Sequence, residues 1–193
     1  MLAPDYPLRT KRLLLRPFEM ADLDALYDIT RRPEVARFEY WEPKTREETA
    51  ESLRRRAGRR AFEAEGDRFG LAVVLPDSGE FVGDVSLKWA SKQSRQGDLG
   101  YMVHPDHQGN GYATEAATEM LRIGFECLDL YRISAGCEPR NTGSVRVLER
   151  LGMRREGHLR RYAYVKGEWW DQFIYAILAD EFTARQSPDV RTA

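Results

Sequence analysis

The chain has 193 residues, 42% of them hydrophobic, a length and composition that suit one domain with a sizeable core. Its 30 basic and 31 acidic residues leave a formal charge of −1, so the charge pattern of a general nucleic-acid binder is absent. The apolar runs are too short to span a bilayer, and the N-terminus lacks the apolar core of a signal peptide. We therefore expect a cytoplasmic protein without nucleic-acid or membrane partners, with one domain over residues 1–180 and a C-terminal tail over residues 181–193.

The first part of the chain is predicted to contain one strand and two helices. Residues 11–16 include three consecutive leucines and are closed by Pro17, which is typical of an opening strand. One helix is predicted to begin at Asp22 and to end at Pro33, and a second begins at Thr45. Many arginines follow in that second helix, but glutamates surround them. This pattern favours a solvated face with internal ion pairs over a basic patch.

Between these helices lies a proline-bounded loop, residues 34–44, that is rich in aromatic and acidic side chains. These are Phe38, Glu39, Tyr40, Trp41 and Glu42. Exposed aromatic rings beside carboxylates suit the binding of an amine-bearing molecule. The alternative is that the rings only pack the loop onto the body of the protein.

Three consecutive strands, joined by turn-rich segments, are predicted over residues 69–75, 81–89 and 98–104. In the second strand two sets of side chains alternate, and each set is expected to share one face of the sheet. One set is Phe81, Gly83, Val85, Leu87 and Trp89, and the other is Val82, Asp84, Ser86 and Lys88.

A glycine-rich turn follows the third strand, which Pro105 ends because proline has no N–H to donate. The turn consists of Gln108, Gly109, Asn110, Gly111, Tyr112 and Ala113. Two glycines separated by one residue allow positive φ angles and a close approach to a ligand. The helix that begins there presents unpaired N–H groups and the positive end of its dipole. The combination predicts a binding turn for a pyrophosphate group.

Two common phosphate-binding motifs do not fit this turn. A P-loop requires a lysine, and the turn has none. The dinucleotide fingerprint requires glycine or alanine where Thr114 stands, and it follows the first strand of a βαβ unit. The form Gln-Gly-x-Gly-x-Ala resembles instead the acyl-CoA loop of the GCN5-related N-acetyltransferases (GNAT). A turn that only begins a core helix is the structural alternative.

The last part of the chain is predicted to complete a mixed sheet. Residues 132–138 form a strand parallel to the third of the strands above, because a helix connects the two. A helix over residues 142–151 begins at Asn141, and two β segments, residues 153–164 and 168–178, meet at a turn. We predict a mixed α/β fold with a mostly antiparallel sheet of about seven strands flanked by about four helices. Cys127 and Cys137 lack metal-type spacing and are expected to be small core residues.

Further motifs resemble the ribosomal-protein N-terminal acetyltransferase branch of the GNAT family, over residues 12–178. They are Leu13-Leu-Leu-Arg-Pro17, Phe81-Val-Gly83, Thr114-Glu115-Ala116, Asn141 with Ser144, Leu151-Gly-Met153, Glu156-Gly157 and Gly167 with Asp171. The sequence departs from the pattern at Met153, where the family has phenylalanine. The resemblance implies the GNAT fold and direct transfer of an acetyl group from acetyl-CoA to a primary amine in a ternary complex. A protein without turnover that binds acyl-CoA as a sensor or scaffold is the alternative.

The resemblance also implies where the donor binds, with no metal. Main-chain N–H groups of the glycine turn would hold the pyrophosphate, and Met102 and Val103 would lie against the pantetheine arm. Asn141 matches a family position whose side chain bonds the arm, although it also suits a helix N-cap. Ser144 matches the residue near the thiol that can protonate it, with an exposed helix serine as the alternative.

The other site assignments concern the base and the acceptor. Glu156 matches a family carboxylate that can act as base, and Asp98 and Asp84 on strands are alternatives. His104 and His107 are more typical of surface or turn residues. The acceptor, a protein N-terminus or a small-molecule amine, is expected to contact Phe38, Tyr40 and Trp41, with Glu168 and Asp171 near by. The branch is often dimeric, so the final aromatic hairpin either forms a homodimer interface or packs inside.

Overall fold

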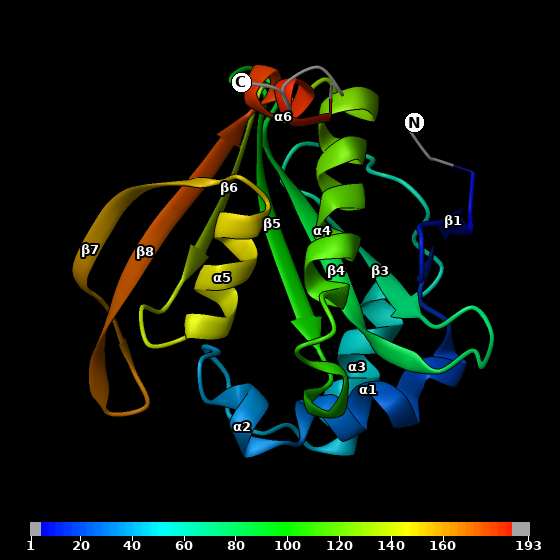
Figure 1. Ribbon diagram of the computed structural model, residues 1–193. Coiled ribbons are helices and arrows are strands. Elements are labelled where there is room, and N and C mark those ends of the chain that lie inside the picture. The colour runs from blue at the N-terminus through cyan, green and yellow to red at the C-terminus, as the bar shows by residue number, and fades with distance from the viewer. Residues whose placement is uncertain (1–4, 187–193) are drawn as a thin grey trace.

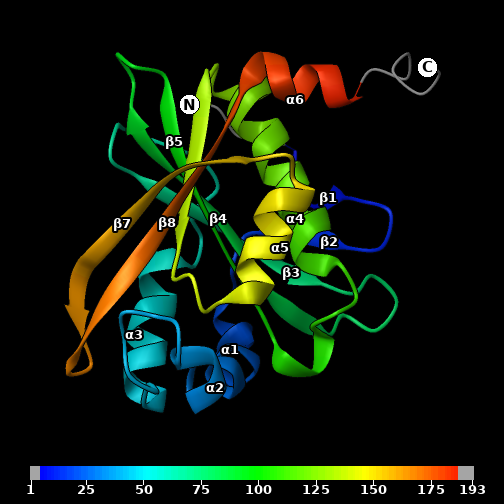
Figure 2. The same ribbon diagram turned by 60° about the vertical axis from the view of Figure 1, so that its left-hand side comes forward.

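An eight-stranded sheet forms the centre of the computed structural model, which describes residues 5–186 (Figures 1 and 2). The strands are β1 (Leu8–Arg9), β2 (Leu14–Arg16), β3 (Arg68–Val74), β4 (Phe81–Ser91), β5 (Gln96–Val103), β6 (Arg132–Cys137), β7 (Arg154–Val165) and β8 (Glu168–Leu178). Their order in the sheet is β1-β2-β3-β4-β5-β6-β8-β7, and only β5 and β6 are parallel neighbours. The predicted mixed, mostly antiparallel sheet is confirmed, with one strand more than expected.

Helices cover both faces of the sheet. They are α1 (Leu23–Thr30), α2 (Pro33–Ala36), α3 (Arg46–Arg56), α4 (Tyr112–Arg122), α5 (Thr142–Arg150) and α6 (Ala179–Gln186). One core cluster joins the sheet to α4 and α5, and a second joins it to α1 and α3 on the opposite face. Within the described residues, no helix has the length and apolar character needed to cross a membrane.

Local signals explain where α3 and α5 begin. The hydroxyl of Thr45 accepts a hydrogen bond from the Glu48 N–H, and the Glu48 carboxylate accepts one from the Thr45 N–H. Asn141 caps α5 by accepting a hydrogen bond from the Ser144 N–H at 3.0 Å. Both helix starts were predicted, because each depends on residues within one turn.

A bulge in β4 corrects one sequence prediction. Val73 of β3 pairs with Gly83, but Val74 pairs with Phe81, so Val82 is the extra residue. Phe81 therefore packs in the core beside α1 and α3, and Val82 packs in the core beside α4. The predicted alternation is wrong for Phe81 and Val82, because an extra residue shifts the side-chain period by one.

Residues 181–193 were expected to be a tail, and this is wrong as far as Gln186. These residues belong to α6, and the Phe182 ring is buried against Phe125, with ring centroids 5.1 Å apart. Phe125 lies in a π-helical turn, Ile123–Cys127, that continues α4. The rest of the expected tail, residues 187–193, lies outside the described residues.

The two parallel strands at the centre of the sheet separate along their length. β5 and β6 pair from Gln96 with Arg132 to Asp98 with Ser134, and no further pairs follow although both strands continue. The sheet is therefore split between Leu99–Val103 and the end of β6. This split places a cavity in the middle of the molecule.

Candidate active site

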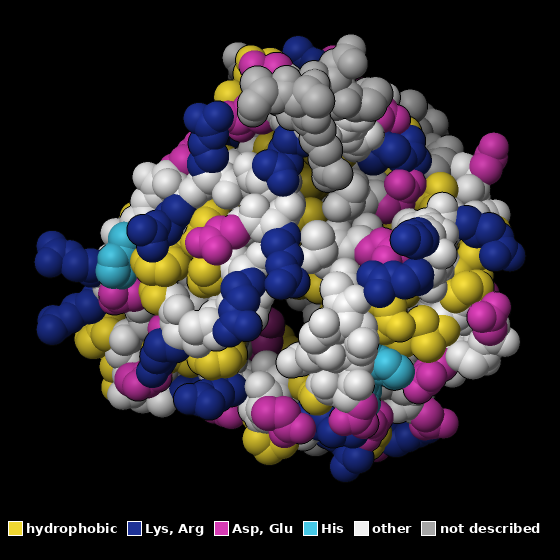
Figure 3. Space-filling view, in the orientation of Figure 1, with side chains coloured by type: hydrophobic (Ala, Val, Ile, Leu, Met, Phe, Trp, Pro, Cys, Tyr) yellow, Lys and Arg dark blue, Asp and Glu magenta, His cyan; other side chains and the backbone are white. Residues whose placement is uncertain are grey.

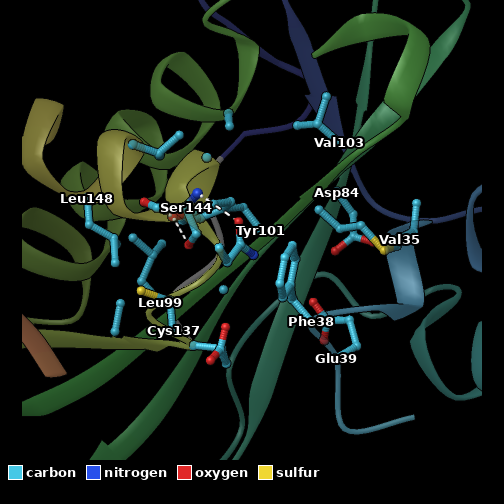
Figure 4. Close-up of a pocket in the computed structure, with 18 of the residues that line it drawn as sticks. Val35, Phe38, Glu39, Asp84, Leu99, Tyr101, Val103, Cys137, Ser144 and Leu148 are labelled. Carbon is cyan, nitrogen blue, oxygen red and sulfur yellow. Dashed lines mark hydrogen bonds between the residues drawn. The ribbon is translucent and has the colours of Figure 1, made fainter. Parts of the chain in front are cut away.

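A cavity of about 1190 Å³ occupies the split. Figure 3 shows it as a hollow between α5 and the turn that precedes α4, and Figure 4 shows residues that line it. Its lining comes from both faces of the sheet, since residues of α4 and α5 contribute on one face and residues of α3 and the loop after α2 on the other. The cavity therefore connects the two faces through the sheet.

The edge of β5 that borders the split turns main-chain groups toward the cavity instead of toward another strand. Just after β5, the His104 N–H donates to the Val82 carbonyl of β4 at 2.9 Å. Main-chain groups alternate in direction along a strand, so the even-numbered residues of β5 form the hydrogen bonds to β4. The main-chain groups of Tyr101 and Val103 then face the split. Those of Met102 face β4, and its side chain packs against the core beside α1 and α3. Both residues predicted to contact the pantetheine arm line the cavity, but only Val103 turns its main-chain groups toward the split.

The glycine turn has the geometry that the sequence predicted. Gly109 and Gly111 have φ angles of 81° and 80°, and Gly111 is the N-cap of α4 without a side chain capping the helix. Of the six residues predicted for this turn, Gln108, Gly109, Gly111, Tyr112 and Ala113 line the cavity. Asn110 does not, since its carbonyl accepts a hydrogen bond from Arg12 at 2.9 Å and its amide donates to His107. The unpaired N–H groups of α4 are thus directed to the cavity.

Thr114, in the first turn of α4, adds a polar group that the sequence analysis did not assign to donor binding. Its Oγ1 is buried, lines the cavity region and has no hydrogen-bond partner among the described residues. A buried hydroxyl without a partner is costly unless a ligand satisfies it. An anionic oxygen at the start of α4 would do so.

Two arginines on α5 lie at the rim of the cavity. Arg146 and Arg150 are exposed, line the cavity, and form no ion pair with a described carboxylate. Figure 3 shows basic side chains gathered over α5 beside the hollow. Their guanidinium groups suit the binding of further phosphate groups. The sequence alone did not indicate this role, because it depends on where α5 lies relative to the cavity.

On the α5 side, two hydroxyl groups meet in the cavity. The Tyr101 Oη lies 2.8 Å from Ser144 Oγ and donates to the Ser144 carbonyl at 3.1 Å (Figure 4). Burial raises the pKa of the Tyr101 phenol, so this group is protonated at neutral pH. The buried Cys137 lies close by, and burial raises the pKa of its thiol to about 11. Ser144 was predicted from its motif, but Tyr101 was not, because its only signal in the sequence is its place in a strand before the turn.

The opposite side of the cavity is acidic and aromatic. Phe38, Tyr40 and Trp41, the residues predicted to contact the acceptor, all line it, and Tyr40 contacts Trp170 at 6.0 Å between ring centroids. The acids there include Glu39, Asp84 and Asp98. Asp98 pairs with Arg68 at 2.6 Å, and Asp84 pairs with Arg56 at 3.3 Å.

Several predicted site residues are not brought to the cavity. Glu156 does not line it, and its carboxylate is paired with Arg132, which lowers its pKa. Glu168 pairs with Arg140, and Asp171 pairs with His158. Of the histidines beside the turn, His107 does line the cavity, and both are paired: His104 with Asp28 and His107 with Glu80, at 2.8 and 3.0 Å.

Comparison with known proteins places the chain in a family. The family described as "Acetyltransferase (GNAT) domain" matches residues 12–154. The chain belongs to the GNAT acetyltransferases. YnaD of Bacillus subtilis, an uncharacterized N-acetyltransferase, is 34% identical over 176 residues, covering 91% of this chain and 98% of its own. The ribosomal protein uS5 alanine N-acetyltransferase of Escherichia coli is 29% identical over 123 residues, 63% of each chain.

The fold comparison agrees with the sequence comparison. A crystal structure of a GNAT-family acetyltransferase from Bacillus anthracis superposes with a TM-score of 0.81 at 33% identity, covering 90% of this chain and 99% of that one. This GNAT protein is therefore an N-acetyltransferase, which moves an acetyl group from acetyl-CoA to an amine. The resemblance seen in the glycine turn is confirmed.

Proposed function

We propose that this enzyme binds acetyl-CoA along the split between β5 and β6 and acetylates a primary amine that lies on the α3 side of the sheet. The observation that supports this proposal is the end of β5–β6 pairing at Asp98 and Ser134. It leaves the main-chain groups of Tyr101 and Val103 that face the split without a strand partner, in line with the glycine turn, and the Val103 carbonyl accepts a hydrogen bond from the Gln108 amide at 3.2 Å. Acetyl-CoA has amide groups in its pantetheine arm, followed by a diphosphate. Its polar groups therefore come in the same order as the main-chain groups of β5 and the N–H groups of the glycine turn.

Each part of the donor then has residues that suit it. The N–H groups at the start of α4 and the Thr114 hydroxyl would hold the diphosphate, and Arg146 and Arg150 would hold the third phosphate. Arg12 supports the turn, because it pairs with Glu115 at 2.8 Å and bonds the Asn110 carbonyl. Asn141 both caps α5 and lines the cavity, so the two roles proposed for it are compatible.

The hydroxyl pair on the α5 side would serve the leaving group. When the amine attacks the thioester carbon, a C–N bond forms, the C–S bond breaks, and the thiolate requires a proton. We propose that Tyr101 and Ser144 supply it together, because they are hydrogen-bonded to each other and the Tyr101 phenol stays protonated. This extends the role proposed for Ser144 to a second residue.

The acceptor is proposed to contact Phe38, Tyr40 and Trp41. Aromatic faces and carboxylates near Asp98 favour a cationic amine. The alanine N-acetyltransferase relative, named for a ribosomal protein, supports a protein N-terminus as one acceptor class, and a small-molecule amine is the other. We place the enzyme in the cytoplasm, where its donor is available, and treat residues 1–180 as one domain that α6 extends to Gln186.

We also propose a homodimer through the β7–β8 hairpin. β7 is an edge strand of the sheet, and the hairpin exposes Tyr162, Tyr164 and Trp169 at 54%, 64% and 57% of their surface. A long edge strand with exposed aromatic rings suits pairing with another chain.

A survey of acceptors tests the proposed function. Release of the CoA thiol is followed with acetyl-CoA and a panel of peptides that begin with alanine or serine, spermidine and lysine-containing peptides, and products are identified by mass spectrometry. We expect one added acetyl group on one amine class. Binding of acetyl-CoA by calorimetry without transfer to any amine would favour a non-catalytic CoA-binding protein instead.

A further inference from the structure

One carboxylate in the cavity differs from the others in its charge partners. The other acids that line the cavity are each paired with an arginine: Glu34 with Arg32, Asp84 with Arg56, Asp98 with Arg68 and Glu138 with Arg140. Glu39 also lines the cavity, but it has no ion-pair partner in the part of the chain that the structure describes. We propose that Glu39 is the catalytic base that takes a proton from the acceptor's ammonium group, with Asp84 as a positioning residue beside it. This proposal rests on the function proposed above.

The loop that carries Glu39 is held in place at both ends. The Glu39 N–H donates to the Ala36 carbonyl at 2.9 Å, and Lys166 Nζ donates to the same carbonyl at 2.6 Å. After Glu39, the Lys44 N–H donates to the Thr30 carbonyl at 3.0 Å. The main chain that carries the Glu39 side chain therefore has a fixed position, as a base that must meet a bound amine requires.

Glu39 faces the donor side across the cavity. Figure 4 shows Glu39 and Asp84 on one side, with the Phe38 ring between them and Tyr101, and Ser144 and Cys137 on the other side. An amine seated against Phe38 would then have a carboxylate on one side and the thioester on the other. This is the arrangement that removal of a proton followed by attack requires.

The charges around Glu39 suit proton uptake near neutral pH. Burial, and after it the nearby Asp84 carboxylate on β4, raise the pKa of Glu39 to about 7. Lys44, Lys166 in the β7–β8 turn and a hydrogen bond with Trp41 act in the opposite direction, and Arg56 of α3 partly neutralises Asp84. An exposed glutamate, with a pKa of about 4.3, would be a much weaker base toward an amine with a pKa of about 8 to 10.

Every proton in the proposed step is accounted for. One N–H bond of the ammonium breaks, and its proton moves to a Glu39 oxygen. The neutral amine attacks the thioester carbon, a C–N bond forms, and the C–S bond breaks. A second proton from the nitrogen passes through the Tyr101 and Ser144 hydroxyls to the departing sulfur, and Glu39 releases its proton to water. The products are an amide, the CoA thiol and one proton.

Kinetics of Glu39→Gln with acetyl-CoA and the best amine of the panel test this role, from about pH 5 to about pH 9. Wild-type kcat/KM is expected to rise through a limb near pH 7, and the variant to lose that limb and about a hundredfold in kcat/KM at neutral pH. Asp84→Asn is expected to move the limb to lower pH, because it removes the negative charge that opposes ionisation of Glu39. Glu42→Gln is the matched control, since Glu42 is exposed on the same loop, and it should stay within about twofold of wild type.

Retention of both the limb and the rate in Glu39→Gln would overturn the assignment. A separate measurement distinguishes this failure from failure of the proposed function. In protein labelled with ¹³C at glutamate carboxyls, one signal is expected to titrate near pH 7 and to be missing from Glu39→Gln. If every glutamate signal titrates below about pH 5.5, Glu39 is not the base, whether or not any amine in the panel is acetylated.

Discussion

Tyr101 and Ser144 form a hydrogen-bonded pair across the split, one from β5 and the other from α5. If the pair protonates the leaving thiolate, Tyr101→Phe and Ser144→Ala should each lower kcat by about 10- to 100-fold, with little change in acetyl-CoA affinity. The double variant should be little worse than the poorer single variant, because residues that act as a unit are not additive. Stopped-flow measurement of thiol release and calorimetry with acetyl-CoA give the two quantities.

Tyr131→Phe serves as the control for these variants, since Tyr131 is an exposed tyrosine outside the cavity lining. Wild-type turnover in both single variants would show that the thiolate leaves without help from this pair.

Glu39 should also affect stability, with a definite dependence on pH. Folding raises the pKa of its carboxyl from 4.5 to about 7, so the folded state holds the proton more tightly than the unfolded state. Its contribution to stability is fully present below about pH 4.5 and is lost as the pH rises through about 7. Glu39→Gln should therefore raise the free energy of unfolding above wild type at about pH 8, by up to about 2 kcal/mol, and change it little at about pH 5.

Urea denaturation at the two pH values measures this difference. Glu42→Gln should show none, because the exposed Glu42 carboxylate is well solvated. A variant that is less stable than wild type at the higher pH would mean that ionised Glu39 stabilises the loop.

Helix α6 is expected to contribute to the stability of the fold, although it lies near the end of the chain. The Phe182 side chain is 6% exposed and packs on Phe125, beyond the end of α4. Phe182→Ala should lower the free energy of unfolding by about 3 kcal/mol, since it leaves a cavity, and Phe182→Leu by less than about 1.5 kcal/mol. Thermal and urea denaturation of the two variants measure these values. Equal stability of Phe182→Ala and wild type would contradict the packing of α6.

The sequence predicted those elements whose signals are local. Thr45 and Asn141 fixed the starts of α3 and α5, and Gly109 with Gly111 fixed the turn before α4, because each acts within one turn of chain. By contrast, α6 depends on contact with Phe125, more than fifty residues earlier in sequence. The exchange of Phe81 and Val82 between faces depends on a bulge that is set by pairing with β3.

The candidate site divides in the same way. The glycine turn and Ser144 were found from local motifs, and the structure brings them to one cavity. Glu156 followed from a local motif as well, but its carboxylate is bound by Arg132 of another strand. Glu39, Tyr101 and Arg146 come to one cavity only because the sheet is split. The register of strand pairing and the separation of β5 from β6 depend on several segments together, so no single segment of the sequence predicts them.

For the molecule as a whole, the β7–β8 hairpin predicts self-association. Size-exclusion chromatography with light scattering should give a dimer for wild type, and Tyr164→Lys should shift it toward monomer, since a lysine on the edge opposes pairing. Tyr40→Lys, which changes a similarly exposed tyrosine on the loop after α2, should leave the dimer intact. If the wild-type protein is monomeric at every concentration tested, the proposed interface is wrong.

The cavity that passes through the sheet has a kinetic consequence. The contacts proposed for the donor lie mainly on the α4 and α5 side and those proposed for the acceptor on the α3 side, so neither substrate would have to pass the other to reach the thioester carbon. Initial velocities at varied concentrations of both substrates should therefore give intersecting double-reciprocal lines. The two substrates should be able to bind in either order, and the inhibition pattern of each product should show no compulsory order. Parallel lines would instead indicate an acetylated enzyme that forms before the amine arrives.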